Sequence, residues 1–111
     1  MTITIQPSGR AFQLDEHLER LKALVADIES LKVGGDPARL AEGNAVHIRG
    51  WSPSTRPVPC LRGTMEGHPS VRDGRHGETS DLWVWAPDHG VARTLSRWYT
   101  LGPSAIRGGW H

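Results

Sequence analysis

The clearest pattern of apolar positions along the chain lies between Leu14 and Val33. Apolar residues recur there at spacings of three and four, at Leu14, Leu18, Leu21, Val25, Ile28 and Leu31. This spacing places them on one stripe of an α-helix, with charged residues on the remaining surface. Acidic residues crowd the first turn and Lys32 lies in the last, as the helix dipole favours. Gly34-Gly35 supplies a left-handed stop.

A second, shorter helix is expected directly afterwards. Asp36-Pro37 has the residue types of an N-cap followed by a first-turn proline, and Gly43 closes the segment after about Glu42. Three prolines, Pro53, Pro57 and Pro59, follow further along. Because proline lacks the N–H that a sheet requires, they predict an extended and exposed connection.

From Ala45 onward the period of the apolar residues changes from that of a helix to that of strands. We expect strands at Ala45–Arg49, Leu61–Gly67, Thr79–Ala86 and Val91–Leu101. Turn-forming residues in the short links between the later segments favour an antiparallel meander. A helix remains the alternative for residues 91–101, because Val91, Leu95 and Trp98 also fit helical spacing. Residues 1–10 alternate Thr and Ile at first, which fits either a short edge strand or a frayed terminus.

Together these elements predict a single α+β domain over residues 1–111. The amphipathic helix and the short second helix are expected to pack on a small antiparallel sheet of three or four strands. Residues 1–10 and 103–111 are expected to be flexible. The apolar stripe of the first helix is also nearly heptad in spacing, so pairing with a second copy is the alternative. Monomer and homodimer therefore both stay open.

Composition narrows the class of protein. The formal net charge is +1, and Cys60 is the single cysteine, which excludes a disulfide scaffold. No apolar run approaches the roughly 20 residues of a membrane helix. The N-terminus lacks the basic and apolar segments of a signal peptide. We therefore expect a cytoplasmic protein with no cofactor and no membrane contact.

The second half of the chain concentrates tryptophan and arginine. Five of the seven aromatic residues are Trp, and residues 44–111 carry eight Arg, no Lys and five acids. No acid follows Asp88. Arginine beside exposed aromatic rings can bind phosphates and stack on bases, and the same residue types dominate protein interfaces. The alternative is that these tryptophans replace the missing Phe and Leu in the core.

Strand periodicity selects the residues of a candidate binding surface. In one strand over residues 91–101, Arg93, Arg97 and Tyr99 would share one face, with Trp98 on the other. On the preceding strand, Trp83 and Trp85 would share a face, opposite Leu82 and Val84. The candidate binding residues are Arg93, Arg97, Trp98, Tyr99 and Trp85.

A series of short motifs runs through residues 57–102. They are Gly67-His68-Pro69, Asp73-Gly74, Thr79-Ser80 with Leu82, Ala92-Arg93-Thr94-Leu95-Ser96-Arg97, Tyr99 and Leu101-Gly102. In their order and spacing they resemble an uncharacterised family of small bacterial proteins, a domain of unknown function. The resemblance implies one small domain and transfers no functional residue.

Catalytic and metal-binding constellations are weaker. His47, His68 and His76 are candidate metal ligands, although their spacing does not match the pairs of a structural zinc site. Cys60 with His68 could form a nucleophilic pair, but no nucleophile-elbow pattern accompanies it. We therefore expect a non-enzymatic adaptor or regulator that binds a protein partner. A nucleic-acid-binding module is the alternative, and a metal-dependent enzyme using clustered His is the third hypothesis.

Overall fold

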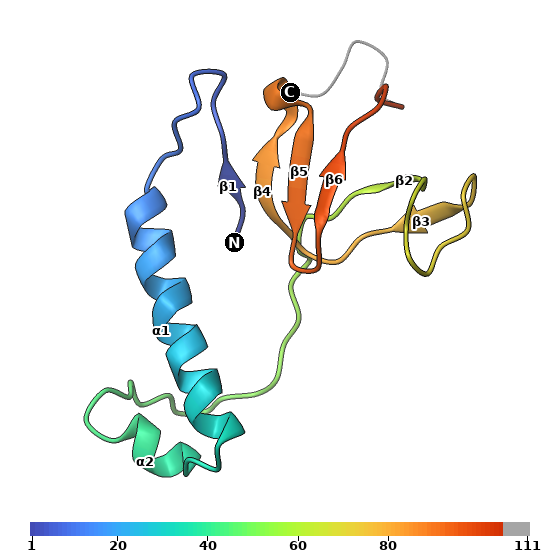
Figure 1. The fold of residues 1–111 in the computed structure, drawn as a ribbon. Coiled ribbons are helices and arrows are strands. Elements are labelled where there is room, and N and C mark those ends of the chain that lie inside the picture. Colours follow the sequence, from blue (N-terminus) through green and yellow to red (C-terminus); the bar gives the residue numbers. More distant parts are fainter. Residues whose placement is uncertain (106–111) are drawn as a thin grey trace. The chain divides into compact units, whose positions relative to one another are not determined.

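The computed structural model describes residues 1–105, which divide into two compact units. One, the helical unit, is Gln13–Arg56. The other, the sheet unit, combines Met1–Phe12 with the described residues from Pro57 on. Figure 1 shows the order of the elements along the chain: β1 (Ile3–Thr4), α1 (Leu14–Lys32), α2 (Pro37–Ala41), β2 (Arg62–Thr64), β3 (His76–Glu78), β4 (Leu82–Ala86), a 3-10 turn (Pro87–His89), β5 (Val91–Thr94) and β6 (Trp98–Thr100).

Both predicted helices are confirmed. Helix α1 is followed by Gly34 in the left-handed region, with a φ of 91°, where glycine carries no steric penalty. Helix α2 begins as its sequence predicts, since the Asp36 carboxylate accepts a hydrogen bond of 3.1 Å from the backbone N–H of Ala38. Local sequence signals therefore account for the end of α1 and the start of α2, whereas α1 begins after Gln13, which is left-handed and makes no side-chain cap hydrogen bond.

The apolar stripe of α1 is exposed except at Leu21, which is half-buried. None of its side chains is buried, and Val25 and Ile28 expose 51% and 53% of their surface. Packing of this stripe on the sheet and pairing with a second copy both stay predictions.

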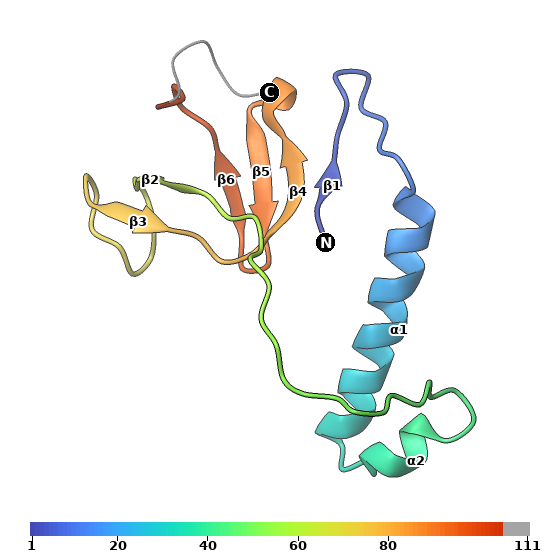
Figure 2. The ribbon, with the colours of Figure 1, turned by 180° about the vertical axis from the view of Figure 1, so that it is seen from behind.

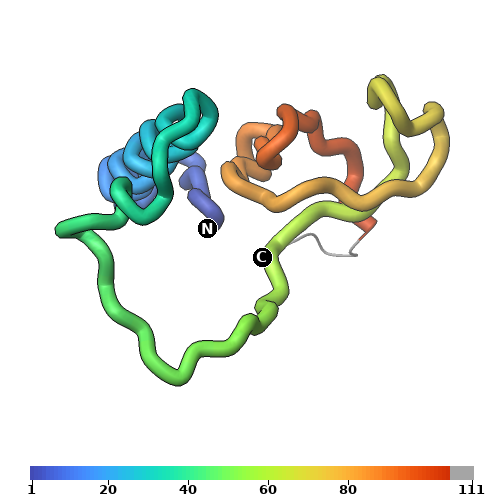
Figure 3. Tube along the Cα trace, turned by 90° about the horizontal axis from the view of Figure 1, so that it is seen from below, coloured from blue at the N-terminus to red at the C-terminus, as the bar shows by residue number. Residues whose placement is uncertain are grey.

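The predicted strand at Ala45–Arg49 is wrong. Residues 44–59 form neither helix nor strand and are exposed throughout, and Figure 3 shows this stretch as one extended run of chain. An isolated segment of five residues cannot form a strand, because no neighbouring strand is present to hydrogen-bond with its backbone N–H and C=O groups. The predicted exposed connection around Pro53 and Pro57 is confirmed.

The sheet unit contains a four-stranded sheet in the order β1-β4-β5-β6. It is mixed, because β1 runs parallel to β4 while the other two pairs are antiparallel, so the prediction of a purely antiparallel sheet is wrong. The long chain between β1 and β4 allows a parallel pair, which no tight turn could make. The Ile5 N–H donates to the Trp85 carbonyl at 2.7 Å, and the Thr2 hydroxyl donates to the Leu82 carbonyl.

The segment Val91–Leu101 is strand rather than helix, but it forms two strands instead of one. A turn at residues 95–97 separates β5 from β6, which pair antiparallel. β2 and β3 form a separate two-stranded sheet, seen apart from the larger sheet in Figure 2. The sequence did not predict β3.

The core of the described chain is small and lies in the sheet unit. Its buried side chains are Ile3, Met65, Leu82, Ala86, Ala92 and Thr94. Among residues 1–105, neither helix has the length and hydropathy required to cross a membrane.

Candidate protein-interaction surface

The strand register assigns side chains to the two faces of the four-stranded sheet. Residues paired across neighbouring strands lie on the same face. Ile3 pairs with Val84, Val84 with Arg93 and Arg93 with Trp98, so these residues form one row across all four strands. We call the face that carries Val84, Arg93 and Trp98 the Arg–Trp face.

The opposite face carries the next row, in which Trp85 pairs with Ala92 and Ala92 with Tyr99. We call it the Trp–Tyr face. The prediction that Arg93 shares a face with Tyr99, opposite Trp98, is therefore wrong. The turn between β5 and β6 reverses the chain, so the alternation of one strand does not continue into the next. Arg97 precedes β6 and lies opposite Thr94, whose N–H donates to its carbonyl, so it shares a face with Tyr99.

A register shift in β4 changes a second predicted pair. Leu82 pairs with Thr94 and Val84 with Arg93, which leaves Trp83 as an extra residue between them. Leu82 consequently lies on the Trp–Tyr face, since Thr94 and Ala92 are two residues apart. The prediction that Leu82 and Val84 share a face is wrong for this reason.

Exposure separates the tryptophans of the sheet unit. Trp98 exposes 59% of its surface, whereas Trp83 and Trp85 are half-buried, as are Arg93 and Tyr99. Leu95, in the turn before β6, is 64% exposed. Trp98 is thus a surface residue and not part of the core. Trp110 lies outside the described residues.

The arginines of this region lack carboxylate partners. Within residues 1–105, the ion pair found is Arg62–Glu78 at 3.7 Å, between exposed side chains. Neither Arg93 nor Arg97 has an acidic group within ion-pairing distance in that range. Nε of Arg97 is buried without a hydrogen-bond partner there. This end of the sheet therefore presents positive charge that the described chain does not neutralise.

β6 is an edge strand with unpaired backbone groups. The Thr94 N–H donates to the Arg97 carbonyl at 2.9 Å, and the Leu101 N–H donates to the Gly90 carbonyl at 2.9 Å. Because hydrogen-bonded and non-hydrogen-bonded pairs alternate in an antiparallel ladder, the N–H and C=O groups of Trp98 and Thr100 point away from β5. No hydrogen bond to these groups is found within residues 1–105. We call these outward groups of Trp98 and Thr100 the β6 edge.

Sequence reasoning missed the β6 edge because it missed the turn. Leu95-Ser96 contains no Gly, Pro, Asn or Asp. Instead, the Thr94 hydroxyl oxygen accepts from the N–H groups of Ser96 and Arg97, at 3.2 and 3.3 Å. The available signal was this threonine, since Ser and Thr side chains can close turns on their own backbone.

The histidine candidates do not form a metal site in the described chain. No group of three His, Cys, Asp or Glu side chains among residues 1–105 is placed to hold a metal ion. His47 is exposed in the helical unit, and His76 is exposed on β3. Nδ1 of His68 accepts hydrogen bonds from the backbone N–H groups of Ser70 and Val71, at 3.0 and 3.1 Å. His68 therefore has a local role in closing a turn.

Cys60 does not have the environment of a nucleophile. Its thiol donates a hydrogen bond of 3.3 Å to the Glu78 carboxylate. This hydrogen bond, followed by desolvation, raises the pKa of the Cys60 thiol above its ordinary value. A raised pKa keeps the sulfur protonated, while the thiolate is the reactive form. The proposed pair of Cys60 with His68 has no support, because the partner of Cys60 is Glu78.

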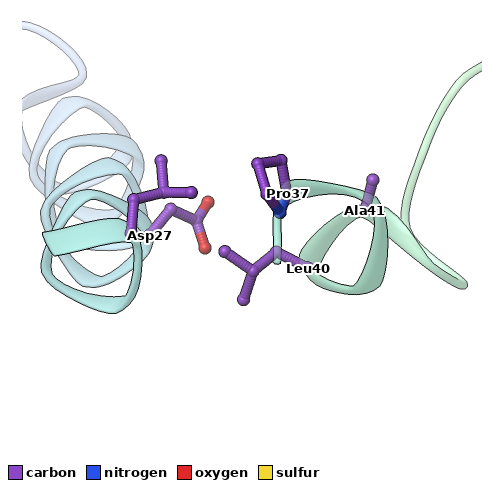
Figure 4. Close-up of a pocket in the computed structure, with 5 residues that line it drawn as sticks. Asp27, Pro37, Leu40 and Ala41 are labelled. Carbon is purple, nitrogen blue, oxygen red and sulfur yellow. The ribbon is translucent and has the colours of Figure 1, made fainter. Parts of the chain in front are cut away.

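The helical unit has a shallow depression of about 240 Å³ between its two helices. Figure 4 shows Asp27 of α1 opposite Pro37, Leu40 and Ala41 of α2. It contains one charged group and an apolar wall, without the converging polar groups that position a small substrate. The depression is therefore a weaker candidate than the surface around Trp98.

Comparison of the chain with family models, with curated proteins and with solved structures finds no match. The resemblance of residues 57–102 to small bacterial proteins stays a prediction.

Proposed function

We propose that this protein is a non-enzymatic binding module that takes a protein partner on the Arg–Trp face and the β6 edge. The observation that carries the proposal is the exposure of Trp98, 59%, on an edge strand directly opposite Arg93. Arg93 and Trp98 form a non-hydrogen-bonded pair, the kind in which side chains approach most closely. The proposed location is the cytoplasm, where a lone thiol such as Cys60 stays reduced.

The residue types favour a protein contact. Tryptophan and arginine are enriched among the residues that contribute most to binding energy, because each buries a large area and adds a directional contact. Leu95, in the turn that precedes β6, is exposed as well. An exposed tryptophan on a sheet edge is costly to maintain in water, so a partner that covers it gains the corresponding free energy.

The test is affinity capture from the cells that make the protein, with three versions of the full chain compared quantitatively. Trp98→Ala should lose proteins that the parent retains. Trp51→Ala is the matched control, because Trp51 is 69% exposed but lies in the helical unit. Equal capture by the parent and Trp98→Ala would contradict the proposal.

Nucleic-acid binding is the second candidate function, and the unpaired arginines favour it. Arg93 and Arg97 have no carboxylate partner in residues 1–105, and a base could stack on exposed Trp98. Binding of a labelled single-stranded oligonucleotide that weakens steeply with salt, and that requires Trp98, would support this function over the first. Binding that is absent, or independent of Trp98, would remove it.

A further inference from the structure

We propose that the β6 edge takes an extended segment of a partner protein as a fifth, antiparallel strand, and that this segment alternates acidic and apolar residues. The inference rests on the proposed function and specifies the partner's chemistry. Strand addition of this kind uses main-chain hydrogen bonds for affinity and alternate side chains for specificity.

The backbone geometry is suited to strand addition. Trp98 and Thr100 each direct one N–H and one C=O away from β5, and nothing in residues 1–105 bonds to them. An antiparallel strand placed there would pair directly with both residues. β6 is three residues long, and Pro103 follows it within three residues, so the added ladder is short. Side chains must therefore supply much of the specificity.

The two faces of the edge require different side chains from the added strand. Residues opposite Trp98 and Thr100 would lie on the Arg–Trp face, beside the exposed indole. Apolar side chains make the most favourable contacts there. The intervening residues would lie on the Trp–Tyr face, beside Arg97. Because the Arg97 cation has no acidic partner in residues 1–105, a carboxylate is the complementary group.

The positive charge of the segment after Asp88 favours a different protein over a second copy of this chain as the partner. Pairing of two β6 edges would bring together the segments that follow Asp88, which contain arginines and no acid. Like charges without neutralising partners oppose such pairing. An acidic segment meets the same arginines with opposite charge.

The test uses the full-length protein and a fluorescent ten-residue peptide of alternating Glu and Val, followed by fluorescence anisotropy. We expect saturable binding that weakens with salt, and no binding of the alternating Lys and Val peptide. In the antiparallel arrangement the valine N–H groups face β6. N-methylation of the valines should therefore abolish binding, whereas N-methylation of the glutamates should leave it intact. Binding that survives valine N-methylation would overturn strand addition.

Protein variants test the side-chain assignments. Trp98→Ala and Arg97→Gln should each weaken peptide binding about tenfold. Trp51→Ala and Arg75→Gln are the controls, since both residues are exposed and neither belongs to β6. The N-methylated peptides keep the test decisive if a variant folds poorly. Equal binding of the acidic and basic peptides would overturn the charge assignment.

The outcomes also separate this inference from the proposed function. If affinity capture depends on Trp98 but the Glu and Val peptide does not bind, the inference fails and the proposed function stands. If capture does not depend on Trp98, the proposed function fails. A dimer seen by sedimentation that Arg97→Glu strengthens would assign the edge to a second copy and overturn the inference. Trp98-dependent binding of an oligonucleotide, without peptide binding, would overturn it too.

Discussion

Thr94 shows how much of the candidate surface depends on one residue. It is the buried polar side chain of residues 1–105, with 1% exposure. Its hydroxyl accepts from the N–H groups of Ser96 and Arg97 and donates to the Arg97 carbonyl, at 3.2 to 3.3 Å. These bonds close the turn that places Trp98 opposite Arg93. The Thr94 hydroxyl thus joins three backbone groups of the turn.

Thr94→Val is expected to lower the free energy of unfolding by about 1–3 kcal/mol, because two turn N–H groups lose their acceptor while the volume stays similar. Urea denaturation measures the change. Thr100→Val, at an exposed threonine of the same hairpin, is the control and should change little. A Thr94→Val protein as stable as its parent would show that the hydroxyl does not hold the turn.

The Cys60 thiol offers a second test at this scale. Its pKa is raised mainly by the hydrogen bond to Glu78, so Glu78→Ala should lower that pKa and let the thiolate form at lower pH. The pH profile of iodoacetamide alkylation should shift downward in this variant. Glu66→Ala, at an exposed acid of the same hairpin, is the control.

An unchanged alkylation profile in Glu78→Ala would contradict the assigned hydrogen bond. The raised pKa also fixes the sign of its linkage to stability. The folded state holds the thiol proton more tightly than the unfolded chain does. The resulting stabilisation is complete below the unfolded-state pKa and is lost as the pH rises through the folded-state pKa.

At the scale of elements, the helices depend on local sequence, whereas the strand pairing depends on residues far apart in the chain. The end of α1 and the start of α2 follow from Gly34 and Asp36, and the helical course of α1 from its apolar spacing, all of which act within a few residues. The pairing of β1 with β4 does not follow from local signals, because the partners are far apart in the sequence. The register shift at Trp83 is equally non-local, since it depends on how β4 meets β5. Side-chain faces predicted by simple alternation therefore failed at the bulge and at the turn.

The role of β1 can be tested at Ile3, which is 7% exposed and pairs with Val84. Ile3→Ala should lower the free energy of unfolding of the sheet unit by about 2–5 kcal/mol, through lost burial and the cavity left behind. Urea denaturation followed by tryptophan fluorescence reports on this unit through Trp83 and Trp85. Met1→Ala, at a residue 46% exposed, should have little effect. Equal effects of the two substitutions would contradict the pairing.

At the scale of the whole molecule, the division into two units was not foreseen. The sequence predicted one domain, and the sheet unit is discontinuous, with β1 contributed from before the helices. The stretch of residues 44–59 between the last helix and β2 has exposed side chains and no regular structure. Such backbone is where proteases cut first.

Limited trypsin digestion should therefore cut early after Arg49, which lies in this exposed stretch. Arg56 should resist, because Pro57 follows it and blocks cleavage. Mass spectrometry of the first products identifies the site. Cleavage after Arg93 or Arg97 before any cut at Arg49 would contradict the expectation that the regular structure of the sheet unit protects it from trypsin.

The central claim is that the surface around Trp98 is where a partner protein binds. The most direct measurement places a photo-crosslinking amino acid at position 98, and separately at exposed position 51, in the cells that make the protein. Discrete protein adducts are expected from position 98 and not from position 51. No adduct from position 98, or the same adducts from both positions, would contradict this claim.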